Sequence, residues 1–176
     1  MMLGEKVLLR ALEPSDLPIL YDWENDTRNW TVSNTLAPFS RCLLEKFIET
    51  SAQDIYTNKQ LRLMVVDLAT SHTVGVLDVF DFEPAHRRAG IGILIEPSSR
   101  GQGFGTDSVL IAKKYLFDVL KLHQIYCHIM VDNIHSISLF QKCGFEICGQ
   151  KKEWVLTSDG YVDEYILQCL NKDSLK

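Results

Sequence analysis

Nothing in the sequence approaches the ~20 consecutive apolar residues that a membrane-spanning helix needs. The N-terminus also lacks the pattern of a secretory signal peptide, because Glu5 and Lys6 interrupt its short apolar start. Basic residues form no stripe, and the formal net charge is −5, which argues against nucleic acid as the main partner. These absences predict a cytoplasmic protein that binds neither membranes nor nucleic acids.

Cysteine and histidine show none of the spacings that hold disulfides or metals. The cysteines are odd in number, form no Cys-x-x-Cys pair and are scattered at Cys42, Cys127, Cys143, Cys148 and Cys169. The five histidines are equally irregular. We therefore expect reduced thiols and no metal site.

The 176 residues also contain no repeat, linker or low-complexity tract. A hydrophobic content of 46% and a charged content of 23% are ordinary for a soluble globular protein. A chain of this length can build one real core, so residues 1–176 are expected to form a single domain.

What the sequence does have is a glycine-rich stretch, Arg-Gly-Gln-Gly-Phe-Gly-Thr, at residues 100–106. Before it, residues 92–97 are apolar until Pro97 and predict a buried strand. After it, residues 107–120 predict a helix from the spacing of Val109, Leu110, Leu116 and Val119. Glycines at such a junction leave backbone N–H groups uncovered. With the positive end of the helix dipole, these groups make a phosphate site.

Two common phosphate-binding loops do not match this stretch. A Walker loop requires Gly-Lys-Ser/Thr, but Thr106 follows Gly105 directly. A dinucleotide fingerprint would need glycine in place of Thr106 and an acidic residue at the end of the next strand. The arrangement Arg-x-x-Gly-x-Gly instead resembles the acetyl-CoA pyrophosphate loop of the GNAT N-acetyltransferases.

A second motif supports this resemblance. Residues 124–131 predict a strand, and Asn133 opens a short helix at residues 133–142. Gly144 is a natural left-handed cap for that helix, and Phe145 starts another strand. The pattern Asn-x-x-Ser-x-x-Leu-Phe-x-x-x-Gly-Phe resembles the second GNAT signature, in the family's order and at about its distance from the first. Within the family, the spermidine N-acetyltransferases are most similar, at residues 86–89, 121–123 and 159–161.

The resemblance implies a single N-acetyltransferase domain with an α/β (α+β) fold. Its mixed, mostly antiparallel central sheet is flanked by helices and has splayed central strands. The hydrophobic pattern predicts strands at residues 6–10, 61–67, 73–82, 87–95, 124–131, 145–156 and 161–170. Ser15 and Ser40 are expected to cap helices, residues 24–39 are expected to be a loop, and Gly75 is expected to mark a bulge.

The resemblance also implies acetyl-CoA as co-substrate, with pantetheine between the strands that end near Ile95 and Val131. One backbone amide of residues 93–95 would polarise the thioester carbonyl. Asn133 would contact the pantetheine or the departing thiolate, and would also cap its helix. The predicted cofactor-binding residues are Ile93, Leu94, Ile95, Arg100, Gly101, Gln102, Gly103, Phe104, Gly105, Thr106, Asn133, Ser136 and Phe140.

The predicted catalytic residues are Asn133, Tyr161 and Asp81. Many family members have a thiolate-protonating tyrosine where this chain has Phe140. Tyr161, Tyr165 or a water would take that role, or the thiolate would leave unprotonated. A water chain or a carboxylate would accept the proton of the substrate ammonium, and the candidates are Glu24, Asp26, Asp78, Asp81, Glu83, Glu153 and Glu164. His128 lies within a strand and is expected to be a core histidine rather than a base.

We therefore expect an acetyl-CoA-dependent N-acetyltransferase that acts on a primary amine of a small molecule, with a polyamine as the first choice. Acetylation of the N-terminus of a ribosomal protein is the alternative, because those transferases share the same layout. A non-catalytic acyl-CoA sensor is a third option, because Phe140 lacks the hydroxyl. Relatives commonly pair through sheet edges or helices, so a homo-oligomer is compatible with the sequence.

Overall fold

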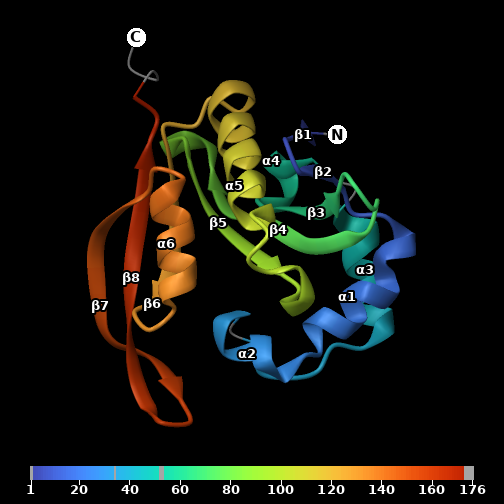
Figure 1. Cartoon of the computed structure of the whole chain (residues 1–176), viewed down its shortest axis with the longest axis horizontal. Coiled ribbons are helices and arrows are strands. Elements are labelled where there is room, and N and C mark those ends of the chain that lie inside the picture. The colour runs from blue at the N-terminus through green and yellow to red at the C-terminus, as the bar shows by residue number, and fades with distance from the viewer. Residues whose placement is uncertain (1, 34, 52–53, 173–176) are drawn as a thin grey trace.

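The structure, a computed structural model, describes residues 2–33, 35–51 and 54–172. Its centre is an eight-stranded sheet in the order β1-β2-β3-β4-β5-β6-β8-β7 (Figure 1). The strands are β1 (Met2–Leu3), β2 (Val7–Ala11), β3 (Leu61–Asp67), β4 (Thr73–Glu83), β5 (Arg88–Ile95), β6 (Gln124–Met130), β7 (Glu146–Thr157) and β8 (Gly160–Leu170). A mixed sheet flanked by helices confirms the predicted fold class.

β5 and β6 are the parallel pair in an otherwise antiparallel sheet. They pair only through residues 88–90 and 124–126. Beyond these residues β5 stays bound to β4 and β6 stays bound to β8. The two strands therefore separate into a wedge, formed by residues 91–95 of β5 and 127–130 of β6. This wedge is the predicted splay of the central strands.

The helices cover both faces of the sheet. They are α1 (Leu17–Glu24), α2 (Thr27–Ser33), α3 (Arg41–Ser51), α4 (Ile55–Asn58), α5 (Phe104–Lys114) and α6 (Ile134–Lys142). A π-helical turn continues α5 at Tyr115–Val119, and 3-10 turns lie at Pro14–Asp16, Pro84–His86 and Pro97–Ser99. In Figure 1, α5 and α6 lie side by side in front of the sheet, and α1 and α3 lie together beside it. No helix among the described residues is long and apolar enough to span a bilayer.

Alternation along the central strands divides the core in two. Leu77 of β4 belongs to the larger cluster, with Val109 of α5 and Phe140 of α6. Its neighbour Val76 belongs to a smaller cluster, with Leu20 of α1. Successive side chains of a strand point to opposite faces, so each face of β4 meets a different set of helices. The sheet is thus fixed from both sides at the wedge.

Several expected elements differ from the structure. Residues 24–39 are not all loop, because α2 forms within them. Asp26 caps this helix by accepting the Arg28 N–H at 3.0 Å, and the polar composition of the segment concealed the helix. Ser15 is not an N-cap either, since it lies inside the 3-10 turn that begins at Pro14. The expected cap at Ser40 is confirmed, with its Oγ accepting the Leu43 N–H at 3.2 Å.

Other details of the strands and helices follow from tertiary packing. The bulge expected at Gly75 is present, since the register between β3 and β4 skips Val74 next to it. The apolar face predicted for residues 107–120 is only partly buried. Val109 and Leu116 are fully enclosed, but Leu110 is 42% exposed and Val119 is 64% exposed. The π-helical turn shifts the phase of the helix before Val119, which local spacing could not reveal.

Candidate active site

The glycine-rich stretch forms the connection from β5 to α5, and we call residues 100–106 the phosphate loop. Gly101 has φ +76° and Gly103 has φ +88°, the left-handed region that other residues rarely adopt. Gly105 serves a different purpose. A Cβ there would lie 2.7 Å from Leu139 Cδ1, so this glycine allows α5 to pack closely on α6. Two glycines therefore shape the loop and one fixes the helix behind it.

The rest of the phosphate loop is held against the end of β5. Arg100 Nε donates to the Ile95 carbonyl at 2.9 Å, so the guanidinium is folded back onto the strand. Gly103 is the N-cap of α5, so the capping residue has no side chain of its own to cover the first N–H groups of the helix. The Phe104 side chain is buried in the larger core, so only its backbone can face a ligand. Thr106 is half-buried in the first turn of α5.

The wedge supplies the second part of the predicted cofactor site. Ile93 and Ile95 pack against the larger core cluster and Leu94 packs against the smaller one. Their backbones pair with β4 on one side only, because β6 has separated on the other side. Backbone groups along this edge are therefore open to hydrogen bonds with a ligand. A linear molecule that carries amides fits such an edge.

Asn133 lies at the start of α6, on the far side of the wedge. Its Oδ1 accepts the Ser136 N–H at 3.2 Å, so the expected N-cap is confirmed. Both residues line a small cavity of about 50 Å³ together with Met130 and His128. Because the cap uses the side-chain oxygen, the amide nitrogen of Asn133 keeps its two donors. These donors suit a carbonyl or thiolate acceptor in the wedge.

Phe140 lies deeper in α6 than the residues that line this cavity. Its ring is 2% exposed and stacks edge-to-face on Phe145, with ring centroids 5.1 Å apart. The position supplies no proton to a leaving thiolate. Tyr165 of β8 packs against the same core cluster, whereas Tyr161 is 64% exposed near the end of the β7–β8 hairpin. Tyr165 is therefore the more enclosed of the two tyrosines considered for the role of proton donor.

His128 is not the core histidine that its place in a strand suggested. Its side chain is 32% exposed and lines the cavity beside Asn133. Nδ1 lies 3.3 Å from Lys151 Nζ and 3.6 Å from Glu164 Oε2. Burial lowers the pKa of His128, and the Lys151 ammonium lowers it further against the opposing effect of Glu164. The imidazole is thus kept neutral. Alternation along β6 alone could not show that this face is open.

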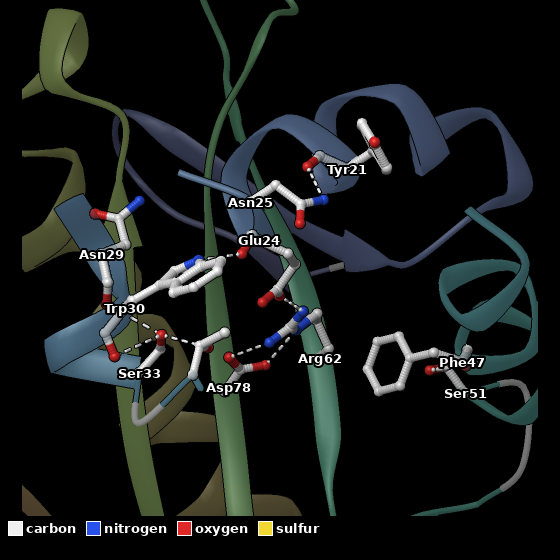
Figure 2. Close-up of polar contacts among 11 residues, drawn as sticks. Tyr21, Glu24, Asn25, Asn29, Trp30, Ser33, Phe47, Ser51, Arg62 and Asp78 are labelled. Carbon is white, nitrogen blue, oxygen red and sulfur yellow. Dashed lines mark hydrogen bonds and ion pairs between the residues drawn. The ribbon is translucent and has the colours of Figure 1, made fainter. Parts of the chain in front are cut away.

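Two of the expected proton acceptors, Glu24 and Asp78, share one arginine. Figure 2 shows Arg62 between Glu24 and Asp78, with Nε and Nη2 donating to Asp78 at 2.6 and 2.8 Å and Nη1 donating to Glu24. We call these three residues the ion triad. It combines one positive and two negative charges. Asp78 also pairs in register with Gly92, which places the triad beside the wedge.

A cavity of about 190 Å³ opens beside the ion triad. Arg62 and Asp78 line it, together with the aromatic rings of Phe47 and Phe80. In Figure 2 the Phe47 ring faces the Arg62 guanidinium, and its centroid lies 5.1 Å from Cζ. Arg62 and Asp78 balance each other in the cavity lining. Glu24 gives the triad its net negative charge, which together with the aromatic faces favours a cation.

The remaining carboxylates are distributed around the acceptor side. Asp81 is exposed at φ +48°, and its Oδ2 accepts the Tyr126 hydroxyl at 3.3 Å, near the closed end of the wedge. Asp26 forms an exposed ion pair with Arg28 at 2.7 Å. Glu83 accepts the Ala85 N–H at 3.3 Å, and Glu153 is exposed on β7. The structure thus brings Asp78, Asp81 and Glu164 near the wedge and leaves Asp26 and Glu153 at the surface.

Comparison with known proteins gives a consistent result. Residues 6–146 match the family described as acetyltransferase (GNAT) domain. The chain is 30% identical over 169 residues to a spermidine N(1)-acetyltransferase of Vibrio cholerae, which covers 94% of this chain and 95% of that protein. It is 28% identical over 151 residues to a spermidine N(1)-acetyltransferase of Escherichia coli, covering 84% of this chain and 76% of that protein.

A solved structure extends the similarity to the fold. The crystal structure of spermidine N-acetyltransferase from Vibrio cholerae in complex with CoA and spermine superposes with a TM-score of 0.85 at 28% identity. The match covers 97% of this chain and 98% of that one. The similarity therefore spans the phosphate loop, the wedge and the acceptor side alike.

Proposed function

Because the chain belongs to the GNAT acetyltransferase family, we propose that it transfers the acetyl group of acetyl-CoA to a primary amine of a polyamine. The observation that carries this proposal is the full-length match to a relative whose structure holds CoA and spermine. The five free thiols favour a reducing compartment, so we place the enzyme in the cytoplasm.

In this proposal the phosphate loop binds the pyrophosphate of acetyl-CoA, and pantetheine extends along the open edge of β5. A backbone N–H of residues 93–95 donates to the thioester carbonyl as negative charge develops on it. Asn133 approaches the sulfur side with its free amide donors. Holding the amine against the carbonyl in this way can lower the barrier by ~7–11 kcal/mol. Placement therefore accounts for most of the catalysis.

The amine attacks only after it loses a proton. His128 suits this step because it is neutral, partly exposed and adjacent to Asn133. After the C–S bond breaks, the sulfur leaves as a thiolate. A thiol with a pKa near 8.5 leaves without full protonation, and Tyr165 or a water can supply the proton afterwards. The absent hydroxyl at Phe140 is therefore compatible with turnover.

Polyamine recognition requires a place for the ammonium groups that do not react. The cavity beside the ion triad offers the Asp78 carboxylate and the Phe47 and Phe80 rings, next to a triad whose net charge is negative. It begins at Asp78, opposite Gly92 in the wedge, so a flexible chain can reach it from the thioester. Asp81, whose carboxylate accepts the Tyr126 hydroxyl at the closed end of the wedge, adds a further negative charge. Each exposed pairing contributes only ~0.2–1 kcal/mol, so several contacts act together.

An acceptor panel tests the proposal by free-thiol release from acetyl-CoA. We expect spermidine and spermine to exceed butylamine, which has the reacting amine but no distal ammonium, by at least about tenfold in kcat/KM. The advantage should shrink as salt screens the distal contacts. Faster acetylation of a peptide that starts with Ser or Ala would favour the protein N-terminal alternative. Binding of acetyl-CoA without thiol release to any amine would favour a sensor.

A further inference from the structure

The phosphate loop has a neighbour from the other end of the chain. Lys6 Nζ donates to the Gln102 carbonyl at 2.7 Å, although the two residues are 96 positions apart. The same ammonium lies against Gly103, where a Cβ would come within 3.1 Å of Nζ. A positive charge therefore rests on the loop at the point where α5 begins.

Lys6 is held there by its own backbone. Asp107, in the first turn of α5, accepts the Lys6 N–H at 2.8 Å through Oδ2. The same carboxylate accepts the N–H groups of Val7 at 3.0 Å and Glu5 at 3.3 Å. The Lys6 carbonyl accepts the Leu68 N–H at 3.0 Å. Because both backbone groups of Lys6 are hydrogen-bonded, its backbone is fixed and its side chain extends over the phosphate loop.

Gly4 makes this close approach possible. A Cβ on Gly4 would lie 2.4 Å from Ile111 Cδ1 and 2.5 Å from Asp107 Oδ2. A side chain at this position would require the Ile111 or Asp107 side chain, or the N-terminal turn formed by residues 4–7, to shift. Gly4, Asp107 and Lys6 thus form one set of contacts that joins the N-terminal turn to the start of α5.

The charges around the start of α5 indicate a role for the Lys6 ammonium. An anion at the start of α5 benefits from the helix dipole but is repelled by the Asp107 carboxylate. Lys6 compensates that carboxylate at the loop itself. An ammonium has three donors, and the bond to Gln102 uses one of them. Two donors are left for phosphate oxygens.

We propose that Lys6 is a phosphate-binding residue of the acetyl-CoA site, whose ammonium keeps its bond to Gln102 and donates to the pyrophosphate above the loop. The inference rests on the proposed use of acetyl-CoA, but it is independent of which amine accepts the acetyl group. It assigns to the N-terminal turn a direct part in cofactor binding, and to Asp107 and Gly4 the part of positioning Lys6.

Calorimetry of CoA binding to the full chain tests this assignment. Lys6→Met removes the ammonium and keeps an apolar stem, and we expect Kd to rise about five- to tenfold. The difference in Kd between Lys6→Met and the parent should become smaller at high salt, because salt screens the ammonium. Lys6→Arg should bind within about twofold of the parent. Lys114→Met is the matched control, because Lys114 is exposed at the other end of α5, about 15 Å along the helix.

Three ligands identify the group that Lys6 contacts. Lys6→Met should also weaken the binding of dephospho-CoA, which keeps the pyrophosphate. The effect of the substitution should vanish for S-acetylpantetheine, which lacks all phosphates, when that compound is compared as acyl donor by kcat/KM. Gly4→Ala should reproduce the loss by displacing the turn. Three results would each overturn the assignment. Lys6→Met could bind CoA with a Kd within twofold of the parent, or lose affinity only for ligands that carry a 3′-phosphate. It could also lose as much kcat/KM with S-acetylpantetheine as it loses affinity for CoA. If the Kd values change as expected but the enzyme does not acetylate polyamines, the proposed acceptor would be wrong and the role of Lys6 would stand.

Discussion

At the scale of single residues, His128 is the side chain whose protonation state matters most for the proposed chemistry. Four groups surround it: Lys151 of β7, Glu164 of β8, Asp81 of β4 and the Tyr126 ring of β6. Burial and Lys151 lower its pKa, whereas Glu164 and Asp81 raise it by a smaller amount. The neutral form therefore persists to a more acidic pH than the ~6.5 of a free histidine. A neutral imidazole can accept the ammonium proton at physiological pH.

We predict that His128→Gln lowers kcat about 100-fold, the lower end of general acid–base effects, because water can substitute in part. In the parent protein, activity should fall as the pH drops through the lowered pKa of His128, since the protonated ring accepts no proton. That acid limb should disappear in the variant. Measurement of kcat against pH, with thermal melts to confirm folding, provides the check.

Lys151→Met supplies the complementary control for His128. Loss of the neighbouring positive charge raises the pKa of the imidazole, so the acid limb should move to higher pH. An acid limb that stays in place in both variants would assign the proton acceptor to another group, with Asp81 next in position.

At the scale of elements, the ion triad joins the end of α1 to β3 and β4. Burial lowers the pKa of Arg62, but Asp78 and Glu24 outweigh that effect and raise it, so the guanidinium remains charged. The Arg62 and Glu24 side chains are each 17% exposed. Removal of one partner from a buried pair leaves its counter-charges uncompensated, which is more costly than loss of the pair as a whole.

We predict that Arg62→Met lowers the free energy of unfolding by about 3 kcal/mol, measured by urea denaturation. Neutralising both carboxylates in that background, with Glu24→Gln and Asp78→Asn, should recover most of the loss. Arg28→Met tests an exposed pair, since Arg28 is 76% exposed, and should lower the free energy of unfolding far less than Arg62→Met. Equal effects at Arg62 and Arg28 would mean that the triad contributes no more than a surface pair.

The elements differ in how far the sequence alone predicts them. β3 has the predicted bounds, and β4 and β6 differ from theirs by one residue, because their apolar runs end at clear turn signals. Asn133 can be recognised as an N-cap because it is a preferred capping residue between a predicted strand and a predicted helix, and its Oδ1 accepts the Ser136 N–H. α2 lies in a polar segment without an apolar stripe, so the sequence predicts a loop there. Local signals suffice for a cap or a bounded strand, whereas a short polar helix depends on its neighbours.

At the scale of the whole molecule, the position of the phosphate loop between β5 and α5 could be predicted, and the arrangement of residues on the proposed acceptor side could not. The loop is continuous in sequence, so its glycines reveal it directly. The ion triad joins residues 24, 62 and 78, and the surroundings of His128 depend on the register of β6, β7 and β8. Lys6 reaches the phosphate loop only through the fold of the N-terminal turn. Such long-range contacts leave no local pattern.

The wedge also divides the sheet into two parts that are joined by few hydrogen bonds. β1 to β5 form one part of the sheet and β6 to β8 form the other, with three residue pairs between β5 and β6. The packing of α5 on α6 adds to this link, with Lys113 Nζ donating to the Cys143 carbonyl at 2.6 Å. A ligand that contacts both edges of the wedge would therefore connect the two parts.

We predict that CoA at a hundred times its Kd stabilises the fold by about 2.7 kcal/mol and raises Tm by roughly 5–10 °C. Hydrogen exchange should slow at residues 91–95 and also at residues 127–131, because the ligand touches both edges. Gly103→Val is the control, since a side chain there is strained at φ +88° and meets Lys6, and it should abolish the shift. Protection confined to the phosphate loop, with β6 unchanged, would show that the cofactor is held by the loop alone and does not bridge the wedge.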